Sequence, residues 1–75
     1  MSRKRLQEII IYPNPVDNKI NINTFVDLNV YNMLGDMIIS KTNINVLDVS
    51  RLHSGVYNIQ IMHDEKTINK RIIKK

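Results

Sequence analysis

The sequence predicts an all-β fold, an Ig-like antiparallel β-sandwich of about seven short strands. Two observations support this prediction: apolar and polar residues alternate with a period of two, and turn residues recur at short, regular intervals. Apolar residues nowhere recur at helical spacing with good caps, so we expect no long helix. The expected strands cover approximately residues 8–12, 19–23, 27–32, 36–41, 44–49, 56–62 and 67–73.

Alternation is clearest in the second, third and sixth of these strands. Ile20 and Ile22 alternate with asparagines, and residues 57–61 alternate in the same way. Leu28 and Val30 flank a further asparagine. This period places apolar side chains on one face of a strand and polar side chains on the other. The turns between strands are marked by Pro13-Asn14-Pro15, Asp17-Asn18, Gly35-Asp36, Ser54-Gly55 and Asp64-Glu65-Lys66.

The stretch Tyr12-Pro13-Asn14-Pro15 has unusual backbone chemistry. Each proline fixes φ and lacks an N–H group, so the stretch is unsuited to donate to a strand ladder. A residue that precedes proline is held extended, and we therefore expect a rigid kink at a sheet edge or at a crossing between sheets. Two roles are open for this kink: a docking surface, or protection of a sheet edge against aggregation.

The stretch from Asp48 to Gly55 predicts a single tight turn. The side chains of Asp48 and Ser50 are of the type that hydrogen-bonds nearby backbone N–H groups. Leu52 is then expected to point back as a plug into the open end of the core. Gly55 is expected to take a positive φ that redirects the chain, and Gly35 to do the same in its own turn.

Length and composition limit the possible functions. The chain has 75 residues, enough for one small domain with little surface left for a deep catalytic cleft. It has no cysteine, which excludes disulfides and thiolate metal sites. No apolar run has the length of a membrane span or a signal peptide. If the polypeptide is exported, we expect its export signal in sequence outside this chain.

The net charge of +4 is concentrated at the two ends, in Arg3-Lys4-Arg5 and in residues 70–75. Basic ends attract nucleic acid or anionic lipid. No aromatic residues interleave with these cations, as a reader of single strands requires, so we favour solvated end residues.

Candidate catalytic and metal-binding residues are few. The two histidines, His53 and His63, would need to lie close together with a third ligand, Asp48 or Asp64, to hold a metal, and we favour exposed turn histidines instead. Ser50 and Ser54 lie near His53 in sequence, but a catalytic triad also needs an orienting acid and an oxyanion site in a cleft. We expect no catalytic residue, no metal site, no cofactor and no enzymatic activity.

The three tyrosines, Tyr12, Tyr31 and Tyr57, suggest an alternative. They could form a platform on which a sugar stacks, although in a sandwich of this size tyrosines are more often core or sheet-end residues. This leaves an adhesive or carbohydrate-binding module of the cell surface as an alternative function. A small basic β-barrel that binds nucleic acid is a more distant one.

Four stretches, taken in order, match the pattern of a known family. They are Ile11-Tyr12-Pro13-Asn14-Pro15, Leu28-x-Val30-Tyr31-Asn32-x-x-Gly35-Asp36-x-Ile38, Val46-x-Asp48-Val49-Ser50-x-Leu52-x-Ser54-Gly55-Val56-Tyr57 and Lys70-Arg71-Ile72-Ile73-Lys74-Lys75. With these stretches the chain resembles the type A C-terminal sorting domains of the type IX secretion system, over about residues 9–75. Residues 1–8 lie outside the pattern, and we expect them to be a flanking segment, either the tail of a preceding domain or an added start.

The resemblance implies a function and a location. Such a domain ends a larger exported protein of Gram-negative bacteria, whose cargo part precedes it in the same chain and carries a separate N-terminal signal. The folded domain is recognised in the periplasm by the outer-membrane secretion machinery and its sortase or shuttle proteins. The cargo then reaches the cell surface or is secreted. No nucleic acid partner and no direct insertion into a membrane are expected.

The resemblance also implies which residues are recognised. We expect the basic residues of the last stretch to lie on an exposed face of the C-terminal strand, where they contact the secretion machinery. The full set of expected recognition residues is Tyr12, Pro13, Asn14, Pro15, Gly35, Asp48, Ser50, Leu52, Gly55, Tyr57, Lys70, Arg71, Lys74 and Lys75.

Overall fold

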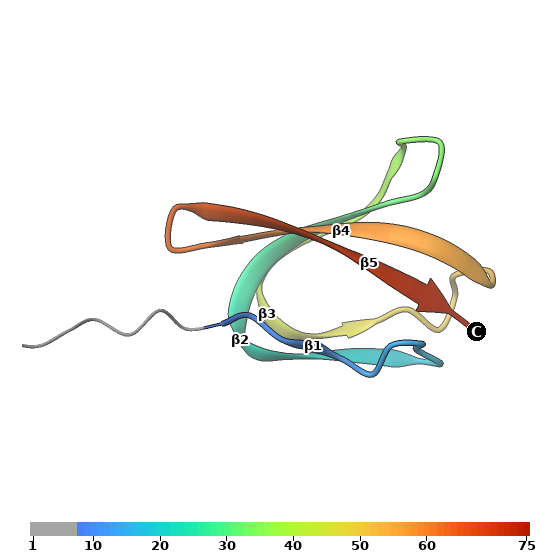
Figure 1. Cartoon of the computed structure of the whole chain (residues 1–75), viewed down its shortest axis with the longest axis horizontal. Helices are drawn as coiled ribbons and strands as arrows, with labels where there is room; N and C mark the ends of the chain where they lie inside the picture. The colour runs from blue at the N-terminus through green and yellow to red at the C-terminus, as the bar shows by residue number, and fades with distance from the viewer. Residues whose placement is uncertain (1–7) are drawn as a thin grey trace, which may run out of the picture.

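The computed structural model describes residues 8–75, and the regular secondary structure in this range consists of β-strands (Figure 1). They are β1 (Ile11–Tyr12), β2 (Lys19–Tyr31), β3 (Met37–Asp48), β4 (Gly55–His63) and β5 (Lys66–Lys74). The all-β prediction is confirmed. The described part of the chain has no helix able to cross a membrane. The expected flanking segment 1–8 lies outside the described residues except for Glu8, and so does the N-terminal basic cluster.

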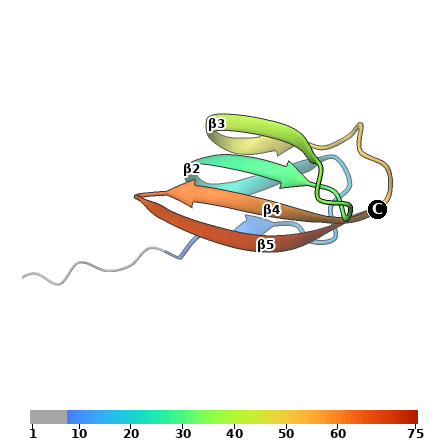
Figure 2. The same ribbon diagram turned by 90° about the horizontal axis from the view of Figure 1, so that it is seen from above.

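The strands form one antiparallel sheet that curls back on itself (Figure 1). The N-terminal half of β2 pairs with β1 and with the end of β3, while its C-terminal half pairs with the start of β3 and with β4. β5 pairs with β4 along its whole length, and Figure 2 shows the resulting order β3, β2, β4, β5. Because β2 and β3 both bend, two parts of the sheet face each other as the two walls of a half-barrel.

The prediction of seven strands is wrong at β2, which joins two of the expected strands. The inward-facing residues Ile20, Ile22, Val26, Leu28 and Val30 are all buried, and all have even numbers. The two-residue period therefore continues through residues 23–27, and this segment contains no glycine or proline to end a strand. A strand with an unbroken period bends without being interrupted, because one face stays toward the core along its whole length.

The same correction applies to β3, which joins the strands expected at 36–41 and 44–49. At the junction Asn43 has a φ of 54°, a conformation that asparagine adopts more readily than most residues. Its N–H donates to the Asp27 carboxylate at 2.8 Å, and the register with β2 shifts between Val26 and Leu28. The polar residues at the junction therefore form a β-bulge, which bends a strand without ending it.

The core lies between the two walls. Its buried apolar residues are Ile9, Val16, Ile20, Ile22, Val26, Leu28, Val30, Leu47, Val49, Tyr57, Ile59, Ile61 and Ile72. Each strand longer than two residues contributes, and so do the loops that contain Val16 and Val49. Removal of these side chains from water is the main force that closes the sheet, since each fully buried aliphatic side chain contributes about 1.5–3 kcal/mol.

Candidate recognition site

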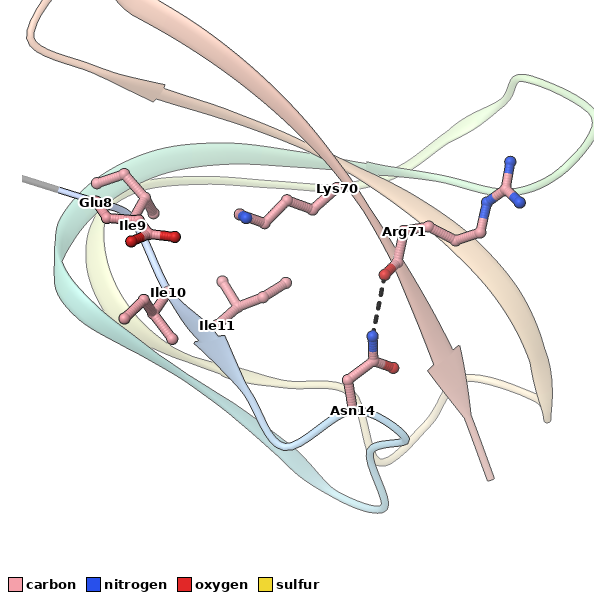
Figure 3. A pocket seen from close by; sticks show the side chains of 7 residues that line it. All are labelled: Glu8, Ile9, Ile10, Ile11, Asn14, Lys70 and Arg71. Atoms are coloured by element: carbon pink, nitrogen blue, oxygen red, sulfur yellow. Dashed lines mark hydrogen bonds between the residues drawn. The ribbon is translucent and has the colours of Figure 1, made fainter.

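The outer edge of β5 is covered at its C-terminal end by the residues that follow β1. The Asn14 side-chain amide donates to the Arg71 carbonyl at 3.2 Å, and its oxygen accepts the Ile73 N–H at 2.9 Å. The Val16 N–H then donates to the Ile73 carbonyl at 2.8 Å, and the Lys75 N–H donates to the Val16 carbonyl at 2.9 Å. We call this set of four hydrogen bonds the clasp (Figure 3 shows the contact of Asn14 with Arg71).

The local sequence explains why a side chain makes half of the clasp. Pro13 and Pro15, on either side of Asn14, have no N–H to offer a neighbouring strand. A side-chain amide carries a donor and an acceptor like those of a peptide group, and Asn14 takes the place of the missing main-chain pairing. Val16 then resumes it with a parallel bridge to Lys74. The stretch thus covers a sheet edge, in agreement with the expected role of edge protection. The other expected role, as a docking surface, stays a prediction.

The turn from Asp48 to Gly55 is held by its own polar groups. The Asp48 carboxylate accepts the Ser50 N–H at 2.9 Å, and the Leu52 N–H donates to the Val49 carbonyl at 3.0 Å. The hydrogen bond from the Ser50 N–H, followed by one from its hydroxyl, holds the pKa of Asp48 below its usual value, with a smaller contribution from nearby cations. The expected tight turn is therefore present, with a carboxylate at its start that is stabilised in its charged form.

Leu52 and Tyr57 attach this turn to the body of the domain. Leu52 is only partly buried and packs against the core cluster, so it covers the end of the core without filling it. Tyr57 is buried, and its hydroxyl donates to the His53 carbonyl at 2.7 Å. Gly55 has a φ of 154°, and no atom lies where its Cβ would be, so it is the backbone conformation that favours glycine here.

The C-terminal cations do not form one exposed face, which corrects the expectation for Lys70, Arg71, Lys74 and Lys75. Lys74 is only 9 % exposed, and its Nζ donates to the Lys75 carbonyl at 3.0 Å. Lys70 is half-buried, whereas Arg71 and Lys75 are exposed. The reason is the alternation of β5: Lys70 and Lys74 share the inner face with the fully buried Ile72.

Three of the four sequence stretches meet at one end of the half-barrel. The clasp joins the first stretch to the last, and the third stretch contacts the last stretch and the loop that follows the first. The Val49 N–H donates to the Asn18 carbonyl at 2.7 Å, and Gly55 lies opposite Lys74 in the ladder. The C-terminus and the turn after β3 lie side by side at this end in both views (Figures 1 and 2). We call it the recognition end.

The turn around Gly35 is not part of the recognition end. It closes the β2–β3 hairpin and extends away from the body of the domain (Figure 1). Gly35 has a φ of 91°, as expected for its turn, and the side-chain oxygen of Asn32 accepts the N–H groups of Leu34 and Asp36. The structure therefore separates this expected recognition residue from the others.

A comparison with protein families decides what kind of domain this is. The family of secretion system C-terminal sorting domains, which belong to the type IX system, matches residues 10–75. The chain belongs to this family. The match covers all five strands, the clasp and the recognition end. A comparison with curated proteins finds no significant match. The family is one of sorting signals, not of enzymes.

The tyrosines and histidines of the sorting domain lie on separate elements. Tyr12 is on β1, Tyr31 is at the end of β2, and Tyr57 is in the core, so the three do not share a platform. The His63 Nε2 lies 3.4 Å from the carboxylate of the adjacent Asp64. Among residues 8–75, no group of three or more histidine and acidic residues is arranged to hold a metal ion.

Two residues important to the recognition end of the sorting domain were missed in the sequence. Val16 is fully buried and makes half of the clasp through its main chain, and Asn18 accepts a hydrogen bond from Val49. A signal for Val16 was present, because it is a single apolar residue between Pro15 and polar neighbours. Asn18 was expected only as a turn residue, and because it contacts Val49 through its carbonyl, which every residue type has, its identity carried no signal for this contact.

Proposed function

We propose that this domain directs a cargo protein, attached at its N-terminal side, through the outer membrane by the type IX system. In this proposal the domain crosses the periplasm folded, is bound there by a sortase or shuttle protein of the outer membrane, and is then delivered with its cargo to the cell surface or the medium. The family match supports the role as a sorting signal. The single observation that supports recognition of a folded domain is the gathering of three sequence stretches at one end.

The clasp suggests how folding and recognition are linked. In an unfolded chain the first and last stretches are far apart, since Asn14 and Arg71 are 57 residues apart. In the folded domain the clasp fixes the last strand so that Arg71, Ile73 and Lys75 point outward together. A receptor that binds this arrangement would accept only cargo whose C-terminal domain has folded, because only then is the outward row of side chains formed.

The test is export of a reporter that carries its own N-terminal signal and ends in this domain. In a bacterium with a type IX system we expect the wild-type fusion outside the cell and the double variant Arg71→Gln, Lys75→Gln in the periplasm. A matched control, Lys41→Gln with Lys66→Gln, removes two exposed cations elsewhere and should be exported normally. Surface changes of this kind alter stability by about 0.5 kcal/mol or less each, so all variants should be folded. A wild-type fusion that stays in the periplasm contradicts the proposal.

A further inference from the structure

A groove opens beside the clasp, between residues 8–11 and the middle of β5. Its volume is about 380 Å³, and Asn14, Lys70 and Arg71 complete its lining. Figure 3 shows that the loop after β1 approaches β5 at Asn14 and that the chain lies farther from β5 toward Glu8. We call this groove the seam. It lies between β1 and β5, next to the clasp.

Both sides of the seam are strand edges with unpaired main-chain groups. On β5 the odd-numbered residues point their N–H and C=O groups away from β4, as the clasp bonds of residues 71 and 73 demonstrate. By the same alternation Thr67 and Asn69, which precede the lining residues Lys70 and Arg71, point theirs away from β4, and neither has a hydrogen-bond partner on that edge among residues 8–75. On the other side the Ile10 carbonyl accepts the Asn23 N–H of β2. Because main-chain groups alternate in direction along a strand, those of Ile11 point away from β2, toward the seam.

A cation also points into the seam. Lys70 is half-buried and extends into the opening between β1 and β5 (Figure 3). No carboxylate oxygen of the described residues, including that of Glu8, lies within 4.0 Å of its nitrogen. Isoleucine side chains of residues 9–11 line the opposite side of the same groove. A cation that is partly withdrawn from water without a partner favours the binding of an anionic group.

We propose that the seam binds an extended strand of a partner protein, with an Asp or Glu side chain placed against Lys70. The main chain of the bound strand would pair with the free edges, which provides affinity, and the carboxylate would provide specificity. A second copy of this chain is a poor occupant, because its own exposed strand edge carries Lys66, Lys70 and Arg71 and would repel these cations. This inference rests on the proposed function, since it assigns the acidic strand to the secretion machinery.

The experiment uses export of the same reporter fusion and two pairs of variants. Asn69→Pro removes a free N–H on the edge of β5 next to Lys70 and leaves the ladder with β4 intact, while Asn69→Ala keeps that N–H. Lys70→Glu reverses the charge in the seam, while Lys66→Glu makes the same change outside it. We expect export to fall on the order of tenfold or more for Asn69→Pro and Lys70→Glu, and to stay at the wild-type level for the two controls. Circular dichroism and urea unfolding identify any variant that has lost its fold. If one test variant is unfolded, the other pair of variants decides whether the seam is needed for export.

The outcomes separate this inference from the proposed function. A wild-type fusion that is not exported contradicts the proposed function itself. Normal export of wild type together with normal export of folded Asn69→Pro and Lys70→Glu overturns the seam proposal and leaves the sorting function in place. Sedimentation of the isolated chain provides a further check: a dimer that Asn69→Pro dissociates identifies a second copy as the occupant and also overturns the proposal.

Discussion

The two ends of β5 differ although they belong to one strand with one neighbour, β4. From Arg71 onward its outer edge is covered by the clasp, and the strand ends beside the recognition end. Before Arg71, the edge at Thr67 and Asn69 is unpaired and leads to Lys70 and Arg71, which line the seam. The difference shows that a single edge strand can hold a small domain closed at one end and still present free main-chain groups at the other.

The largest effect is expected where β5 meets the core, at Ile72. This side chain is fully buried, and Ile72→Ala should lower the free energy of unfolding by about 2–5 kcal/mol, as large-to-small changes in a core do. Urea unfolding followed by circular dichroism measures it. Its neighbour Ile73 is 46 % exposed on the outer face, so Ile73→Ala is the matched control. Similar losses for the two variants would show that the inner and outer faces of β5 are assigned wrongly.

A smaller effect is expected from the clasp. Asn14→Ala removes both hydrogen bonds to β5 and should cost about 1–2 kcal/mol, since each contributes roughly 0.5–1.5 kcal/mol and water reaches the groups left behind. Asn14→Asp keeps the acceptor for the Ile73 N–H and loses the donor to the Arg71 carbonyl, so its loss should be intermediate. Urea midpoints of the three proteins provide the test. Equal midpoints for wild type and Asn14→Ala would show that the clasp does not stabilise the fold.

Sequence reasoning recovered those features of the fold that depend on neighbours in the chain. Period-two alternation predicted the β-structure and the inner residues of β2 and β4, and the turn signals predicted the positive φ of both glycines. The predicted number of strands was wrong because polar residues occur both in turns, which end a strand, and in bulges such as that at Asn43, which only bend it. The continued alternation of apolar residues at even positions in β2 was the better guide, since it indicates that one strand continues.

Features that depend on distant residues were not recoverable. The proline-rich stretch predicted a kink at an edge, but nothing local showed that Asn14 pairs with a strand 57 residues later. The burial of Lys74 was missed for a related reason. A lysine at the end of the chain is normally solvated, and its position depends on β5 being paired on both edges at this end. The seam was also missed, because a free edge is a property of the assembled sheet.

The recognition end also depends on a buried tyrosine. Tyr57→Phe removes the hydrogen bond from the hydroxyl to the His53 carbonyl and should lower the free energy of unfolding by about 0.5–1.5 kcal/mol. The ring itself stays in place, so the variant isolates the polar contact from the apolar packing. Thermal unfolding measures the loss. Tyr31→Phe is a suitable control, because the Tyr31 hydroxyl makes only a long contact of 3.5 Å with Gln60. A larger loss in the control would mean that Tyr57 does not hold the turn.

The smallest effect concerns pH and the turn carboxylate. The pKa of Asp48 is lowered in the folded protein, so its stabilising effect is complete at pH values above the unfolded pKa, near 3.8, and is lost as the pH falls through the folded value. The difference in stability between wild type and Asp48→Asn should therefore be constant above about pH 5 and shrink in more acidic solution. Urea titrations across this range provide the measurement. A difference that grows on acidification would contradict the hydrogen bond from Ser50.

The contrast between the two ends of β5 is tested most directly by amide hydrogen exchange of the isolated chain, followed by nuclear magnetic resonance. The N–H groups of Ile73 and Lys75 donate within the clasp, while those of Thr67 and Asn69 lie on the unpaired part of the same edge. We expect slow exchange at the first pair, fast exchange at the second, and fast exchange at Ile73 once Asn14 is replaced by alanine. Equal protection along the whole edge, or slow exchange at Thr67 and Asn69, would contradict a strand that is closed at one end and open at the other.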